Sequence, residues 1–373
     1  MNKRMMVAVV LAVLMAASAH AQTTRYFLYV TNASSGDVSA YALNPSTGAL
    51  TAIVGSPLHA GSSPWGIAAD LTGKFLYITN SASKNVCAYT INPGTGNLSL
   101  VNGSPFPTGS NPWGIAVDPK GKFLYVSNGG SSDISAFMIG PSTGGLSEVK
   151  GSPFPAKMYA SGIDVDPTGT FLYDVNWSGA ANVSAYRINR SSGTLAAVRG
   201  SPFTAGTFPL GVTVEPTGKF LYVANQVNAE TTPKSGSSSV SACMINPKTG
   251  ELSAVSGSPF VAGTNPAAIA IDLTGKYLYV SNNASANVSA FAINLSNGAL
   301  TEIKGSPFAA GLDPEGIAVD PTGKFLYVAN HGSGNVSAYA IDPSTGALKT
   351  LHGSPFAAGS GPSLIAIVKV TGP

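Results

Sequence analysis

Three charged residues in the middle of the chain occupy positions where they could perform acid–base chemistry. Asp164 and Asp174 interrupt apolar runs, and Arg187 lies in a third run, where similar segments elsewhere in the chain have Ala, Thr, Val, Ile or Met. Burial makes such groups costly unless they are paired and hydrogen-bonded. Two neighbouring carboxylates can also hold one raised pKa that suits proton transfer. The three residues therefore predict either a catalytic or ligand site, or a buried Asp–Arg–Asp bridge.

The expected strand register brings these three side chains together. Side chains alternate between the two faces along a strand. If Asp166 pairs with Thr170 across the intervening turn, Asp164 and Asp174 lie diagonally on one face. The following strand, in its expected register, adds Arg187 to that face.

Aromatic residues form a second candidate site. The chain has three tryptophans, Trp65, Trp113 and Trp177, and Lys157 and Tyr159 precede the third. Aromatic rings provide a large contact area with a polar handle, which suits stacking on a sugar ring or holding a peptide. These five residues are therefore predicted to bind a ligand. The alternative is that each Trp closes a channel mouth or packs on a neighbouring element.

Glu315 and His331 form a third candidate, since a carboxylate and an imidazole can act as an acid–base pair. The alternative is that both are ordinary surface residues. No cluster of His, Cys, Asp or Glu has the spacing of metal ligands. The sequence predicts neither a metal site nor a cofactor.

The candidate residues all belong to one repeated unit. Each copy contains Phe-Leu-Tyr or a close variant, and the tyrosines of these motifs are Tyr29, Tyr77, Tyr125, Tyr173, Tyr222, Tyr279 and Tyr327. They are spaced 48, 48, 48, 49, 57 and 48 residues apart. A fixed period of this size indicates a repeat architecture, in which each unit buries its apolar faces against its neighbours.

One unit, residues 314–356, contains four β-rich runs separated by Gly, Pro, Asn and Asp turns. Antiparallel units of this kind, repeated roughly four to eight times, close into a β-propeller. The repeats begin with a second strand, 27–30, and end with an unpaired first strand, 364–368. We therefore predict an all-β, seven-bladed β-propeller of four-stranded antiparallel blades. The C-terminal strand is expected to join the N-terminal blade and close the ring.

In this topology the loops that enter the first strands and those that join second to third strands lie on one face, called here the upper face. The aromatic residues, Glu315 and His331 are expected there. The loop 226–239 carries a nine-residue insertion. Two interpretations of the insertion stay open: a flap over the upper face, or a segment without fixed structure.

Residues 1–21 have the pattern of a secretory signal peptide. Lys3 and Arg4 precede an apolar run, 5–17, and residues 19–21 read Ala-His-Ala, the form of a cleavage site. The run is shorter than the roughly 20 residues that span a bilayer. We predict that residues 22–373 form the propeller, that it is secreted or periplasmic, and that it does not insert into a membrane after cleavage.

The low charge of the chain limits its partners. The formal net charge is +3 and charged residues make up 10% of the chain, whereas about 25% is usual. This argues against nucleic acids and membrane surfaces as partners. We expect a monomer that binds a small molecule, a glycan or a protein.

Several motifs together resemble one family. Phe-Leu-Tyr-Val-x-Asn, Val-Ser-Ala-Tyr, Thr-Gly-x-Leu, Gly-Ser-Pro-Phe and Gly-Ile-Ala-Val-Asp-Pro-Thr-Gly-Lys resemble the seven-bladed lactonase-like propellers, which include 6-phosphogluconolactonase and the muconate-lactonising enzymes. The resemblance covers about residues 25–370. It implies the same fold. It also implies that an active member carries Pro-Arg-His at the start of one inner strand and Asn-Glu at the end of a second strand.

Neither of these two catalytic motifs is present. The residues after the Pro that opens each first strand are Trp65, Trp113, Leu210, Ala267, Glu315 and Ser363, with Ser161 in the copy that lacks the Pro. The residues after the Asn that ends each second strand are Ala33, Ser81, Gly129, Trp177, Gln226, Asn283 and His331. The catalytic residues that the resemblance implies therefore have no counterparts in this chain.

Three functions remain open. The favoured one is a secreted propeller that binds a small ligand of sugar or sugar-acid type, or a protein, on its upper face. The second is a lactone hydrolase, a carboxylic ester hydrolase like 6-phosphogluconolactonase, that uses other residues. The third is a structural cell-surface propeller. An enzyme predicts a pocket where groups with perturbed pKa converge, a binding protein predicts exposed Trp around a cavity, and a structural protein predicts Trp buried between blades.

Overall fold

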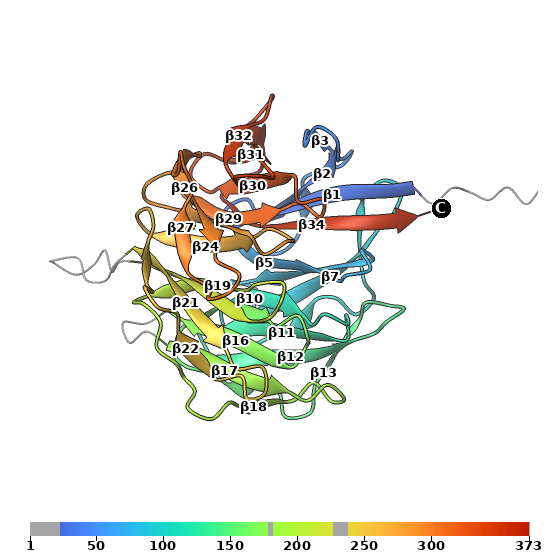
Figure 1. The fold of residues 1–373 in the computed structure, drawn as a ribbon. Coiled ribbons are helices and arrows are strands. Elements are labelled where there is room, and N and C mark those ends of the chain that lie inside the picture. The colour runs from blue at the N-terminus through green and yellow to red at the C-terminus, as the bar shows by residue number, and fades with distance from the viewer. Residues whose placement is uncertain (1–22, 178–181, 227–237, 373) are drawn as a thin grey trace, which may run out of the picture.

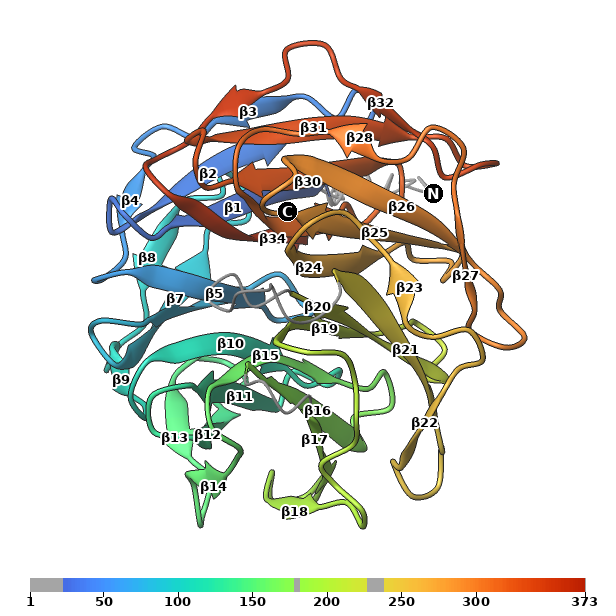
Figure 2. The same cartoon turned by 90° about the vertical axis from the view of Figure 1, so that its left-hand side faces the viewer.

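The computed structural model describes residues 23–177, 182–226 and 238–372 of the chain. These residues form seven small antiparallel sheets arranged in a ring, without a helix (Figure 1, Figure 2). The predicted all-β, seven-bladed β-propeller is confirmed. The predicted signal peptide, 1–21, lies outside the described residues, and so does the greater part of the 226–239 insertion.

Each blade has four main strands that follow one another from the central channel outward. The innermost strands are β34 (Pro362–Gly372), β5 (Pro64–Ala69), β10 (Pro112–Val117), β15 (Ala160–Val165), β19 (Pro209–Val214), β24 (Pro266–Ile271) and β29 (Pro314–Val319). The second strands are β1 (Thr23–Asn32), β6 (Phe75–Asn80), β11 (Phe123–Asn128), β16 (Phe171–Asn176), β20 (Phe220–Asn225), β25 (Tyr277–Asn282) and β30 (Phe325–Asn330).

The third strands are β2 (Asp37–Leu43), β7 (Asn85–Ile91), β12 (Asp133–Ile139), β17 (Asn182–Ile188), β21 (Ser239–Ile245), β26 (Asn287–Ile293) and β31 (Asn335–Ile341). The outermost strands are β3 (Leu50–Ala52), β8 (Leu98–Leu100), β13 (Leu146–Glu148), β18 (Leu195–Ala197), β22 (Leu252–Ala254), β27 (Leu300–Glu302) and β32 (Leu348–Thr350). Blades are numbered here in this order, so that the first contains β34 and β1 and the fourth contains β15 to β18.

A two-residue strand adds to six of the described blades. These short strands are β4 (Leu58–His59), β9 (Phe106–Pro107), β14 (Phe154–Pro155), β23 (Phe260–Val261), β28 (Phe308–Ala309) and β33 (Phe356–Ala357), and each pairs with the third strand of its blade. In the fourth blade a single bridge between Val183 and Phe203 takes its place. Each predicted four-stranded blade thus has one additional short segment. It pairs with the third strand, past the point where the outermost strand ends.

The C-terminal strand closes the ring. β34 pairs antiparallel with β1, from Thr23 opposite Gly372 to Asn32 opposite Pro362. Figure 1 shows the red β34 lying beside the blue β1. The predicted closure of the N-terminal blade by the C-terminal strand is confirmed, and both ends of the propeller lie side by side.

The Tyr that recurs in each unit joins its blade to the next. Tyr77 is fully buried, and its hydroxyl donates a hydrogen bond of 3.1 Å to the carbonyl of Gly144 in the following blade. The same contact joins Tyr29 to Gly96, Tyr125 to Gly193, Tyr173 to Gly250, Tyr222 to Gly298, Tyr279 to Gly346 and Tyr327 to Gly48. Gly144 has a φ of 69°, and a Cβ added to it would lie 2.3 Å from the ring of Phe75. The spacing of Phe-Leu-Tyr and Thr-Gly motifs is therefore set by contacts between blades.

The acidic turns fix the register of the first two strands. In the fourth blade, the backbone N–H of Asp166 donates to the carbonyl of Phe171, and the Asp166 carboxylate accepts from the N–H groups of Thr168, Thr170 and Phe171. Asp166 therefore faces Phe171 and not Thr170, so the turn holds one residue more than predicted. Since side chains alternate along a strand, a shift of one residue changes the face on which each one lies.

Candidate functional site

One hydrogen bond builds the upper rim in every described blade. The residue before each innermost strand has a positive φ, as in Tyr159 (57°) and Asp313 (49°). Its carbonyl accepts a hydrogen bond from the residue after the Asn that ends the second strand; Trp177 N–H donates to Tyr159 and His331 N–H to Asp313, both at 2.9 Å. Residues from two loops of one blade are thereby held side by side at the mouth of the channel.

A β-bulge places the next ring of side chains. In the second blade, Pro64 lies opposite Asn80 and Ile67 opposite Ile78, so the inner strand has one extra residue. Bulges of this kind redirect side chains next to functional sites. Gly66 follows Trp65, and a Cβ on it would lie 2.2 Å from the carbonyl oxygen of Trp113 in the next blade. The inner strands therefore approach closely and leave Trp65 and its counterparts at the channel mouth.

The upper loops enclose a cavity of about 400 Å³. Its described lining residues are Trp65, Asn111, Trp113, Gly129, Tyr159, Ala160, Ser161, Trp177, Leu210, Gln226, Asn265, Asn283 and Glu315. The central channel forms a second space of about 190 Å³, which shares Trp65, Trp113, Leu210 and Glu315 with the cavity. The mouth of the channel is thus where the variable residues of consecutive blades converge.

Two aromatic clusters cover one side of the cavity. The rings of Trp65 and Trp113 are 4.5 Å apart between centroids and tilted by 54°. Trp177 lies edge-on between Tyr159, at 6.5 Å, and Phe208, at 5.6 Å. Tyr159 is 51% exposed and Trp177 is 42% exposed. The tryptophans therefore lie around an open space, which is the arrangement expected of a binding protein or an enzyme.

The structure places four of the five predicted ligand-binding residues in this cavity. The fifth, Lys157, belongs to the loop that carries Tyr159 but is exposed and is not among the lining residues. Phe208, Asn283 and Gln226 were not predicted as site residues. The signal that could have found them is their position, because each stands directly before an inner strand or after a strand-end Asn.

Glu315 contributes a carboxylate to the cavity wall from the start of β29. The side-chain amide of Asn283 donates a hydrogen bond of 2.7 Å to its Oε1. Burial, and after it the nearby carboxylate of Asp313, raises the pKa of Glu315 to about 7, against the lowering effect of the Asn283 hydrogen bond. At neutral pH the carboxyl group is therefore poised between its protonated and ionised forms, as a general acid or base requires.

His331 does not pair with Glu315. Its ring lies 6.4 Å from the ring of Trp65 between centroids, and its backbone is held by Asp313. Within the described residues no hydrogen bond or ion pair joins the two side chains. The two residues therefore do not form the predicted acid–base pair. Glu315 lies in the cavity wall, and His331 lies beside Trp65 at the channel mouth.

The predicted grouping of Asp164, Asp174 and Arg187 is wrong. Asp164 lies opposite Tyr173, and Asp174 lies opposite Ile163, so the two carboxyl groups are on opposite faces of the sheet. The turn described above is the reason, because its extra residue shifts the pairing by one position. Neither the catalytic group nor the Asp–Arg–Asp bridge is formed.

Each of the three residues has a separate partner. Asp164 accepts hydrogen bonds from the backbone of Val165, at 2.8 Å, and of Val214 in the next blade, at 2.9 Å. Burial raises the pKa of Asp164 to about 6. Arg187 lies over the ring of Phe171, 4.6 Å from its centroid. Asp164 thus links two inner strands, whereas Arg187 covers the outside of its blade.

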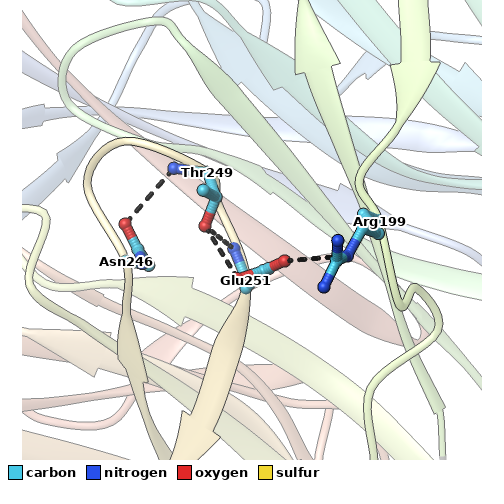
Figure 3. Close-up of polar contacts among 4 residues, drawn as sticks. All are labelled: Arg199, Asn246, Thr249 and Glu251. Atoms are coloured by element: carbon cyan, nitrogen blue, oxygen red, sulfur yellow. Dashed lines mark hydrogen bonds and ion pairs between the residues drawn. The ribbon is translucent and has the colours of Figure 1, made fainter.

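Arg199 also lies on the outer surface. Its Nε is 3.9 Å from Oε1 of Glu251, and Thr249 donates a 3.1 Å hydrogen bond to the same carboxylate (Figure 3). Arg199 is 96% exposed in its side chain, and exposed ion pairs contribute about 0–1 kcal/mol. The arginines of the fourth blade therefore do not contribute to the cavity.

Most blades anchor their upper loop through a Gly. In the seventh blade, a Cβ on Gly311 would lie 2.6 Å from Cγ of Asn330. The Asn330 amide accepts from the Gly311 N–H at 3.1 Å and donates to Ser337 Oγ at 2.9 Å. The strand-end Asn therefore needs a residue without a side chain at this loop position.

The fourth blade replaces this arrangement. Lys157 stands at the loop position of the Gly, and Asn176 instead donates to Oδ2 of Asp174, at 2.9 Å, while Ser184 donates to Asn176. Asp174 is fully buried, and burial raises its pKa well above the usual range. The exchange of Val or Ile for Asp174 is thus explained by the altered loop above it. Asp174 accepts a hydrogen bond from the strand-end Asn and does not line the cavity.

The described residues hold no cluster of metal ligands and no helix that could cross a membrane. No group of three or more His, Cys, Asp or Glu side chains in them is arranged to hold a metal ion. No helix in the same part of the chain has the length and apolarity needed to cross a membrane.

Comparison with solved structures identifies proteins of the same fold. A putative 6-phosphogluconolactonase from Bacteroides uniformis is 20% identical with a TM-score of 0.77, over 92% of this chain and 99% of that one. A second from Bacteroides fragilis is 23% identical with a TM-score of 0.75, over 92% and 98%. The periplasmic gluconolactonase PpgL of Pseudomonas aeruginosa is 20% identical with a TM-score of 0.76, over 93% and 99%. None of the curated proteins compared with the chain matches it.

Sequence comparison with protein families covers most of the chain. The family described as "Lactonase, 7-bladed beta-propeller" matches residues 20–157, 149–253 and 235–365. This agrees with the resemblance carried by the repeated motifs and with the ring of seven blades. The chain belongs to the Lactonase family of seven-bladed β-propellers.

Proposed function

We propose that the chain binds a small ligand of the sugar type in the upper-face cavity. The observation that carries the proposal is the convergence of Trp65, Trp113, Tyr159 and Trp177 on one space of about 400 Å³. Pockets for small molecules measure about 300–1,000 Å³ and combine apolar walls with a few polar groups. Aromatic faces can stack on the apolar face of a sugar ring. The side-chain amides of Asn and Gln residues in the wall can donate to and accept from its hydroxyl groups.

A thermal-stability assay tests this proposal. Glucose, gluconate and freshly dissolved glucono-δ-lactone are each added to the folded chain, because a ligand that binds the native state raises its Tm. At least one of them should raise the Tm, and Trp113→Ala should weaken that effect by about tenfold or more in concentration. Met244→Ala, on the exposed outer surface, is the control. An unchanged response in Trp113→Ala contradicts binding in this cavity.

A second candidate function is hydrolysis of a sugar lactone, which the family and Glu315 favour. The ionised carboxylate of Glu315 would remove a proton from a water molecule while the water oxygen bonds to the lactone carbonyl carbon. The ring C–O bond then breaks, and Glu315 returns the proton to the leaving oxygen. The product is an open-chain hydroxy acid. Because the base form predominates above a pKa of about 7, hydrolysis should rise with pH through that value.

Glu315→Gln separates the two candidate functions. The substitution removes the base and keeps the size of the side chain. The rate of glucono-δ-lactone hydrolysis is measured by titrating the released acid, and the uncatalysed rate is subtracted. In Glu315→Gln this enzyme-dependent rate should fall by about a hundredfold or more. Binding of glucose in the same variant should persist. Hydrolysis at the wild-type rate in Glu315→Gln would exclude Glu315 as the base.

We also propose that the chain is exported and loses residues 1–21. The charged, apolar and Ala-His-Ala segments described above support this proposal. Expression of the full chain in a bacterium and N-terminal sequencing of the exported protein should give Gln22 as the first residue. Retention of Met1 in the cytoplasmic fraction would contradict export.

A further inference from the structure

The groups that form the cavity share one electrostatic character. The faces of the Trp and Tyr rings are the negative parts of their quadrupoles. Glu315 adds a carboxylate to the same space, and the carboxylate of Asp313 lies close enough to raise its pKa. Trp65 and Trp113 border both the cavity and the channel below it, as does Glu315. A small ligand at the channel mouth therefore meets aromatic faces and a carboxylate together.

Among the residues that the structure describes, no ion pair compensates the charge of Glu315. The group that hydrogen-bonds to it is the neutral amide of Asn283. Asp313, in the loop before β29, acts on Glu315 with a charge of the same sign, Tyr159 lines the same cavity, and His331 lies beside Trp65. The raised pKa of Glu315 means that these surroundings favour the uncharged form of its carboxyl group. A cation brought into the cavity would reverse that preference.

Aromatic side chains with a carboxylate can recognise a cationic amine. An ammonium group over the face of Trp or Tyr is attracted by the ring, and a methylated ammonium group loses less hydration when it is buried there. The Trp65–Trp113 pair and the Tyr159–Trp177 pair offer rings at several angles, 54° and 89° between planes. Such a set of faces can surround a rounded ammonium group more completely than a flat stack can.

We propose that the cavity recognises a ligand bearing a positively charged amino or ammonium group, placed between the aromatic faces and the Glu315 carboxylate. The ligand class that fits both this charge and the sugar-type site is an amino sugar. The inference rests on the proposed function, because it adds a charge preference to the same cavity. It also predicts that an anionic group, such as a phosphate, binds poorly beside Glu315.

Matched pairs of probes test the charge preference directly. Choline is compared with dimethylbutanol, its neutral isostere in which carbon replaces nitrogen, and glucosamine is compared with glucose and with glucose 6-phosphate. Titration calorimetry with the full chain should show the highest affinity for the cation, a lower one for the neutral molecule and the lowest for the anion. The charged member of the choline pair should bind on the order of tenfold more tightly. Equal or weaker binding of the cation in both pairs overturns the inference.

Proton release gives an independent readout. A cation stabilises ionised Glu315 and so lowers its pKa, which releases a proton on binding below and near pH 7. Calorimetry of choline or glucosamine in two buffers of different ionisation enthalpy measures that release. Glu315→Gln should bind without releasing a proton and should lose the preference for the cation. Proton release that persists in Glu315→Gln contradicts the assignment.

A second variant tests the inference in case Glu315→Gln alters the folded structure. Trp177→Leu replaces an exposed ring and should lower the affinity for choline more than for dimethylbutanol, since the isostere has no cation–π attraction. Met244→Ala is again the control. If glucose binds but the cation binds no better in either pair, the inference fails and the proposed function stands. If neither these probes nor gluconate or glucono-δ-lactone binds, both fail.

Discussion

At the scale of single residues, Glu315 couples proton binding to stability. The pKa of Glu315 is about 7 in the folded state and about 4.3 in an unfolded chain. Between these values the folded state holds the proton that the unfolded state releases, so the free energy of unfolding falls as pH rises. Glu315→Gln removes this loss and should therefore be more stable than wild type by about 1–3 kcal/mol at pH 8, but not at pH 4.

Urea denaturation of both proteins at the two pH values measures this difference. Glu251→Gln is the matched control, because the Glu251 carboxylate is on the outer surface. It should show no comparable change with pH. A difference between wild type and Glu315→Gln that is the same at both pH values would contradict a raised pKa.

The aromatic residues of the cavity and Glu315 could be predicted from the sequence, whereas the grouping of Asp164, Asp174 and Arg187 could not. Trp65 and Glu315 follow the Pro that opens an inner strand, and this position in the repeat determines their place at the channel mouth. The face of Asp164 depends instead on the pairing across one turn, and a single residue reverses it. The sequence of the turn does not determine how many of its residues lie outside the strand pairing.

At the scale of one element, the loop before β15 and the end of β16 changed together. Lys157 removes the place that a Gly gives to the strand-end Asn in other blades, and Asp174 accepts the Asn176 amide instead. Asp174→Val alone should leave that buried amide without an acceptor and cost about 1–3 kcal/mol. In the double variant with Lys157→Gly, the Asn176 amide oxygen can accept from the loop N–H while its NH2 group donates to Ser184, the pattern of Asn330, and stability should recover.

Denaturation of the wild type, both single variants and the double variant gives the coupling energy. We expect the Asp174→Val and Lys157→Gly effects to be non-additive by about 0.5–3 kcal/mol. Purely additive effects would show that the two substitutions are unrelated. Asp174 resembles a catalytic residue in the sequence because its partner, Asn176, and the exchange of Gly for Lys157 become related only through the fold.

The contact between blades gives a second element-scale prediction. Tyr77→Phe removes the hydrogen bond to the Gly144 carbonyl and leaves that acceptor unpaired, which should cost about 1–2 kcal/mol. Gly144→Ala should cost more, because its backbone has a positive φ and the added Cβ meets the ring of Phe75. Tyr159→Phe, at the exposed rim, is the control and should leave the Tm unchanged. A Tm in Tyr77→Phe equal to that of wild type would contradict the role assigned to the hydroxyl.

At the scale of the whole molecule, the period of the repeat was sufficient to predict the fold. Six Phe-Leu-Tyr motifs and one Tyr-Leu-Tyr at nearly constant spacing indicate seven similar units, and the Tyr–Gly hydrogen bonds show why the spacing is kept. The short strand that borders six of the seven third strands escaped prediction because it has only two residues and follows a Gly-Ser-Pro turn. Strands of that length carry no periodicity.

Closure of the ring by β34 can be tested separately from the order of the strands along the chain. β34 supplies the innermost strand of the first blade, and Thr23 lies opposite Gly372 at the two ends of the propeller. Deletion of residues 362–372 should leave β1 without its inner partner and abolish a cooperative unfolding transition. A circular permutant that joins 372 to 23 by a short Gly-Ser linker, and begins in the exposed turn at 191, keeps every strand pair. It should unfold cooperatively with a Tm close to that of residues 22–373, as measured by circular dichroism. If the deletion variant unfolds with an unchanged Tm, β34 does not close the ring; if the permutant fails to fold, the position of the termini matters beyond the contacts between strands.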